Sequence, residues 1–171
     1  MVAAINCIGC PHLGTVALEA TIGVYSGEDE VTRLYSRIRA PYQLEDLSDY
    51  QFQAVQYATS KSATWWSSDK SIPSENQFLQ SFRFLVENYR PMFVATKGSS
   101  QRLLLQRVLL ESGMQVAVHD LWGDGMPRFE DYPRMTAALC SQHQSSNSRK
   151  SVYCTQHRAM QIADYCMKYC L

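Results

Sequence analysis

An excess of charge of either sign, long apolar runs and targeting features are all missing from this sequence. Its 171 residues carry 16 Lys and Arg and 16 Asp and Glu, for a formal net charge of zero. Non-selective nucleic-acid binding rests on a surplus of Lys and Arg, so any nucleic-acid role must rest on a local basic patch. No apolar run approaches the length of a membrane span, and residues 1–14 lack the positive start, apolar stretch and cleavage site of a signal peptide. These absences predict an intracellular protein, cytoplasmic or nuclear, with no membrane partner.

The composition is that of a globular protein. Hydrophobic residues make up 46% of the chain and charged residues 19%, which excludes a largely disordered chain. The length suits one domain over residues 1–171, and internal repeats are absent. In an intracellular protein the six cysteines are expected to be reduced or metal-bound, because disulfides belong to oxidising compartments.

Hydrophobic periodicity predicts an alternation of strands and helices. The first two strands are expected to form a hairpin, and Ser74 and Gln77 have the spacing of a capping box at the start of the clearest helix. The expected strands are 15–25, 30–40, 92–96 and 114–121, and the expected helices lie within 43–60 and over 74–90, 101–112, 133–140 and 154–170. This order predicts an α/β fold with a mixed sheet flanked by helices.

Two Cys-x-x-His pairs lie ten residues apart near the end of the chain. Cys140 and His143 form the first pair, and Cys154 and His157 form the second. Thiolate and imidazole are the commonest ligands of zinc, which prefers four of them in a tetrahedron. The pairs therefore predict a zinc site, and the alternative is that four unrelated residues happen to be close in sequence. A Cys/His hydrolase is disfavoured because no nucleophile context resembles one.

Glu19 interrupts an otherwise apolar strand. A buried carboxylate is unfavourable unless it is paired, hydrogen-bonded or bound to metal, so Glu19 either has such a partner or faces solvent. At the N-terminus, Cys7, Cys10 and His12 could form a second metal site, supply ligands to the first, or belong to a packed segment; the sequence leaves this open.

A second chemical pattern resembles metal-dependent exonucleases of the DEDDh type. Such enzymes hold two divalent ions with carboxylates and use a His to act on the attacking water. The corresponding residues here are Glu19, Asp120, His157 and Asp164. The first acid of the pattern is replaced by Ala17, and the spacing from His157 to Asp164 is longer than the pattern requires. A capping or solvated role for Asp164 is the favoured interpretation.

Basic side chains could supply the local patch that a nucleic-acid role needs. Arg33, Arg37 and Arg39 alternate along one face of the second expected strand, and Lys97 follows the third. With Arg102 and Arg107 these residues could bind phosphates, while Trp65 and Trp66 could stack on bases. Solvated surface charge and packed tryptophans are the ordinary alternatives, and both remain open.

Two segments resemble the Maelstrom domain. "LEATIGVYSGEDEVTRLYSRIRAP" resembles the segment in which a Glu opens a strand that is followed by a hairpin and a Pro. "ALCSQH…YCTQHRAMQIADY" resembles the late Cys-x-x-His…Cys segment that runs into a final helix. This family has an RNase H-like fold related to DEDDh exonucleases, and it acts in small-RNA (piRNA) silencing.

The resemblance implies a structural zinc site made by Glu19, Cys140, His143 and Cys154 in place of the catalytic acids. Spacing alone favours His157 as the fourth ligand, whereas the resemblance favours Glu19. The functional hypothesis is therefore binding of single-stranded RNA, with weak or absent nuclease activity. The alternatives are a divalent-metal-dependent exonuclease and a non-catalytic module that binds protein partners.

Overall fold

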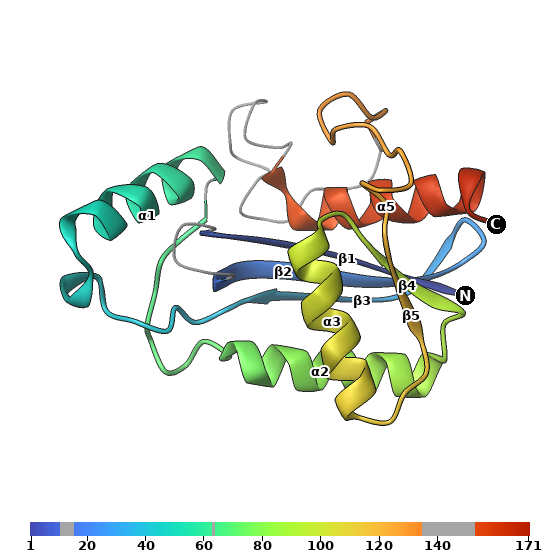
Figure 1. Ribbon diagram of the computed structural model, residues 1–171, viewed down its shortest axis with the longest axis horizontal. Helices are drawn as coiled ribbons and strands as arrows, with labels where there is room; N and C mark the ends of the chain where they lie inside the picture. The colour runs from blue at the N-terminus through green and yellow to red at the C-terminus, as the bar shows by residue number, and fades with distance from the viewer. Residues whose placement is uncertain (11–15, 63, 135–152) are drawn as a thin grey trace.

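A mixed five-stranded sheet lies at the centre of the computed structural model, which describes residues 1–10, 16–62, 64–134 and 153–171. The strand order is β3-β2-β1-β4-β5 (Figure 1). The strands are β1 (Val2–Cys10), β2 (Val16–Ser26), β3 (Asp29–Arg37), β4 (Phe93–Thr96) and β5 (Ala117–Asp120). β2 pairs antiparallel with β1 and β3, whereas β1 with β4 and β4 with β5 are parallel pairs.

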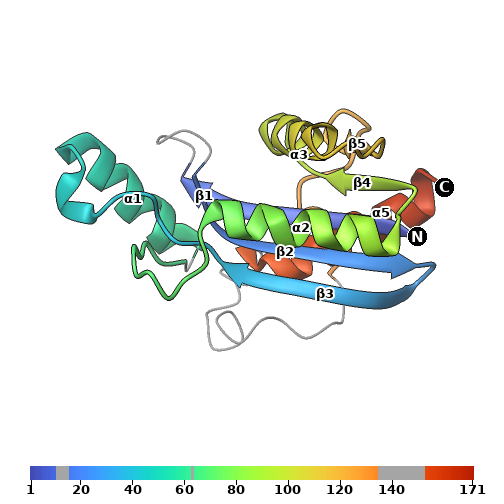
Figure 2. The same ribbon diagram turned by 90° about the horizontal axis from the view of Figure 1, so that it is seen from below.

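Helices cover both faces of this sheet. The described residues form the 3-10 helix η1 (Leu44–Asp46) and the α-helices α1 (Asp49–Ser62), α2 (Glu75–Tyr89), α3 (Ser99–Glu111) and α5 (Thr155–Tyr169). Figure 2 shows α2 on one face of the sheet and α5 on the other. α1 extends beyond the end of the strands (Figure 1). This arrangement confirms the predicted α/β class with a mixed sheet flanked by helices.

Each face of the sheet has its own hydrophobic core. On one face Phe82 of α2 and Leu109 of α3 pack with Ile5 and Ile22. On the other face Ile162 of α5 packs with Ala4 and other strand residues. Successive side chains of a strand point to opposite faces, so the central strands β1 and β2 supply both cores. None of the helices in the described part of the chain is long and apolar enough to cross a membrane.

β1 was not predicted, and the strand that carries Glu19 is therefore the second strand and not the first. β1 reads "VAAINCIGC", and Val2, Ala3, Ala4 and Ile5 are all buried. A central strand covered on both faces has no alternation of polar and apolar residues. β1 therefore lacks the sequence pattern by which a partly exposed strand such as β3 can be predicted. The predicted hairpin is confirmed as β2 and β3.

The helices of the described residues form where local signals in the sequence indicate them. The capping box of α2 is formed, because Gln77 N donates to Ser74 Oγ and Ser74 N donates to Gln77 Oε1. The predicted helices over 101–112 and 154–170 are confirmed as α3 and α5, and the helix expected within 43–60 is α1. The helix expected over 133–140 lies outside the described residues from 135 onward.

Candidate functional site

One edge of the sheet carries several of the predicted site residues. β1, β3, β4 and β5 end at this edge, and β2 begins there, because it runs against its neighbours. Glu19 pairs in register with Arg37 of β3. Lys97 directly follows the last residue of β4, and Asp120 is the last residue of β5. In open α/β sheets, ligands commonly bind outside the carboxyl ends of the parallel strands.

Glu19 is fully buried at this edge and faces α5. The hydroxyl of Thr155 donates to Glu19 Oε1 at 3.1 Å, and it also shares a 2.8 Å hydrogen bond with the hydroxyl of Thr21. Residues on one face of a strand are two apart, so Glu19 and Thr21 both point to α5. The solvent-facing alternative for Glu19 is therefore wrong: its carboxylate belongs to a buried polar cluster under the start of α5.

Cys154 and His157 lie at the start of α5. Cys154 is the N-cap residue and is fully buried, and His157 is 7% exposed. Burial lowers the pKa of His157 below its ordinary value, and the nearby Arg134 and Arg158 add to this effect. Because Thr155 follows Cys154 directly, its hydrogen bond to Glu19 places that carboxylate against the residue next to Cys154 in the chain.

The other two predicted ligands, Cys140 and His143, lie outside the described residues. Among the residues that the structure describes, no group of three or more His, Cys, Asp and Glu side chains could hold a metal ion. Cys10 and His12 are not described at the side-chain level, so the N-terminal metal hypothesis also stays a prediction. Burial, and to a smaller degree Glu75, raises the pKa of Cys7 to about 12.

The residues of the exonuclease alternative take part in structural hydrogen bonds. Asp120 Oδ1 accepts from the backbone N–H groups of Gly98 and Trp122, at 2.8 and 3.1 Å. Asp164 Oδ2 accepts from the Tyr132 hydroxyl and the Lys168 ammonium, both at 2.7 Å. The first carboxylate thus fixes the turn after β5, and the second ties α5 to the preceding loop.

The predicted basic residues of β3 differ in how far their charges are already paired. Arg33 forms a 2.9 Å ion pair with Glu30 and donates to Gln156 Oε1 at 2.7 Å. The guanidinium of Arg37 stacks on the ring of Trp65, 4.4 Å from its centroid, and Trp65 is 55% exposed. Arg37 and Trp65 thus present a cation and an aromatic ring together at the surface.

Lys97 lies on the other side of the same edge, with β2 and β1 between β3 and its strand. Its ammonium donates to the carbonyl oxygens of Met126 and Pro127. The ring centroids of Trp122 and Phe129 lie 5.1 and 5.0 Å from this ammonium nitrogen. Burial lowers the pKa of Lys97. These contacts hold the loop after β5 against β4.

Sequence reasoning missed several polar residues of the site. Thr21 and Thr155 are ordinary in sequence, and their partners are more than a hundred positions away. Asn6 belongs to the unpredicted strand β1, pairs in register with Thr21 and is 2% exposed. Its Oδ1 atom accepts no hydrogen bond from the described residues. Asn6 is the single polar residue in the run "VAAINCIG", and this isolated position is the one signal that could have indicated its role.

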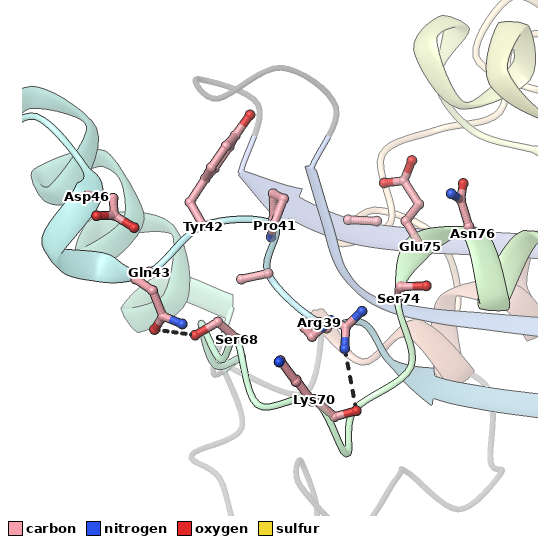
Figure 3. A pocket seen from close by; sticks show the side chains of 12 residues that line it. Arg39, Pro41, Tyr42, Gln43, Asp46, Ser68, Lys70, Ser74, Glu75 and Asn76 are labelled. Carbon is pink, nitrogen blue, oxygen red and sulfur yellow. Dashed lines mark hydrogen bonds between the residues drawn. The ribbon is translucent and has the colours of Figure 1, made fainter.

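A pocket of about 630 Å³ opens close to this edge, between the end of β3 and the start of α2. Figure 3 shows Arg39 and Lys70 between Gln43 and Asp46 on one side and Glu75 and Asn76 on the other. Ala17, two residues before Glu19, also lines it. Of the predicted RNA-binding residues, Arg39 is the one that lines this pocket.

The chain matches no family model and no curated protein sequence.

Proposed function

We propose that this chain is an RNase H-like, RNA-binding domain of the Maelstrom type that acts in small-RNA silencing, with a structural zinc site and weak or absent nuclease activity. The observation that carries the proposal is the buried Glu19 carboxylate, held by Thr155 beside Cys154. Residues 19 and 154 lie in the two segments that carry the sequence resemblance, and the hydrogen bond from Thr155 links the first of them to the neighbour of the second.

The sheet supports the RNase H-like assignment. RNase H-like domains have the strand order 3-2-1-4-5 with the second strand antiparallel to the rest, and the described sheet has this order and these directions. A fold alone does not specify an activity, so the functional part of the proposal rests on the site.

The chemistry at the start of α5 fits a zinc ion. Glu19 and Cys154 are fully buried. The oxygen atoms of a carboxylate and the sulfur atom of a thiolate are both zinc ligands. The buried Oδ1 of Asn6, which pairs in register with Thr21, adds a further polar atom to this centre and accepts no hydrogen bond from the described residues. Cys140 and His143 would supply the remaining ligands. A zinc ion held by these residues would cross-link β2 to the start of α5, and a structural zinc ion contributes about 10–16 kcal/mol of apparent binding energy.

The same edge offers a surface for single-stranded RNA. Single strands are bound by cations that contact phosphates and by aromatic rings that stack on bases. Arg37 with Trp65 provides one such pair, and Arg39 lies close by at the adjoining pocket. The engagement of Asp120 and Asp164 in structural hydrogen bonds supports weak or absent two-metal catalysis.

Elemental analysis of the purified chain tests the metal site. We expect one zinc ion per chain, lost in Cys140→Ser and in Glu19→Gln and kept in His157→Gln. Zinc lost from His157→Gln and kept in Glu19→Gln would assign the fourth ligand to His157 instead. A wild-type chain without zinc would contradict the metal site altogether.

Labelled single-stranded RNA tests the binding function. We expect the wild-type chain to bind it without trimming its ends, whether or not Mg²⁺ is added. Trimming that depends on Mg²⁺ or Mn²⁺ would support the exonuclease alternative. A zinc-loaded chain that binds no RNA would leave the protein-interaction module as the function.

A further inference from the structure

The pocket near the end of β3 is built from three segments that hold one another in place. Arg39 N donates to Pro73 O and Ala40 N donates to Ser67 O, each at 2.7 Å. The indole N–H of Trp66 donates to Tyr42 O at 3.0 Å. A site whose walls are fixed before a ligand arrives loses less entropy on binding. Its volume of about 630 Å³ lies in the usual range for small-ligand sites, about 300–1,000 Å³.

Charges of both signs line this pocket without neutralising each other. Arg39 and Lys70 are cationic, and Asp46 and Glu75 are anionic. In the described part of the chain none of these four forms an ion pair, and the Arg39 guanidinium donates only to the carbonyl of Lys70, at 3.4 Å. A ligand whose anionic group lies at Arg39 and Lys70, and whose N–H donors reach one of the two flanking carboxylates, would match this arrangement.

A nucleotide has both features. Its phosphate accepts hydrogen bonds from Arg and Lys side chains, and the Watson–Crick edge of an unstacked base is read by side-chain hydrogen bonds. An ionised carboxylate only accepts hydrogen bonds. Guanine presents two neighbouring N–H donors on that edge, which match the two oxygens of one carboxylate, whereas uracil presents one donor between two acceptors.

We propose that this pocket binds one guanosine nucleotide of a single-stranded RNA, with its phosphate at Arg39 and Lys70 and its base edge at Glu75. Tyr42, which is half exposed, also lines the pocket, on the side of Gln43 (Figure 3). This inference rests on the proposed RNA-binding function and adds to it a specific subsite and a base preference.

The test compares two labelled RNAs by fluorescence anisotropy: an oligouridine of about eight nucleotides and the same oligomer with one central guanosine. We expect the wild-type chain to bind the guanosine oligomer about tenfold more tightly, since a good bidentate contact gives discrimination of that order. Glu75→Gln should remove most of this preference, because the amide replaces one acceptor with a donor. Lys70→Ala should weaken binding of both oligomers by a similar factor.

Two substitutions on the exposed side of α2 serve as matched controls. Arg83→Ala and Glu87→Gln change the same charges on side chains that do not line the pocket, and both should bind like wild type. If the wild-type chain binds neither RNA, the proposed function fails together with the subsite. If it binds RNA but Lys70→Ala and Glu75→Gln match the controls, or if it shows no preference for guanosine, the subsite alone is overturned.

Discussion

The hydroxyl of Thr155 connects α5 to β2 through two buried hydrogen bonds, to Glu19 and to Thr21. Thr155→Val keeps the shape of the side chain but removes this donor from a buried carboxylate. We expect the free energy of unfolding to fall by about 1–3 kcal/mol, measured by urea denaturation. Thr155→Ser retains the hydroxyl and should lose less. Equal losses in the two variants would show that the hydrogen bonds do not stabilise the fold.

His157 should make stability depend on pH. Burial lowers its pKa in the folded protein below the ordinary 6.5, so the unfolded chain binds a proton more readily. Its contribution to stability is therefore fully present above pH 6.5 and is lost as the pH falls through the lowered pKa. Urea denaturation of wild type and His157→Gln across this range should give a shallower decline in the variant. Identical slopes would show that His157 does not titrate differently in the folded state.

At the scale of elements, α2 was predictable and β1 was not, for the same physical reason. Ser74 and Gln77 form a local signal within one turn, and Phe78, Phe82 and Val86 repeat at helical spacing on the buried face. When one face of a helix lies in solvent, the spacing of its apolar residues in the sequence indicates which face is buried. β1 is buried on both faces, so nothing in its sequence alternates.

The packing of α2 on the sheet gives a matched pair of substitutions. Phe82 is fully buried against the sheet, whereas Phe84, two positions later on the same helix, is 65% exposed. Phe82→Ala should lower the free energy of unfolding by about 3–5 kcal/mol, because it leaves a cavity in the core. Phe84→Ala should change it little. Similar losses measured by chemical denaturation would contradict the placement of α2.

At the scale of the whole molecule, the candidate site joins residues that are 136 positions apart in sequence. The sequence indicated that Glu19 either has a partner or faces solvent, because a buried carboxylate without a partner is unfavourable. It could not identify Thr155, since a threonine near a helix start has many ordinary roles. Long-range pairing of this kind depends on the order of strands, and that order placed β2 and β1 together beneath α5.

Removal of the proposed zinc ion should therefore loosen a defined part of the molecule first. Hydrogen exchange followed by mass spectrometry, before and after treatment with a zinc chelator, measures this directly. We expect protection to fall most at the start of α5 and in β2 around Glu19, because the proposed zinc ion links these segments. The pairing of α2 and α3 with the opposite face of the sheet does not involve the site, so those helices should lose protection later. A uniform loss across all elements would mean that the metal stabilises the fold as one cooperative unit, and no change would place the zinc outside the folded core.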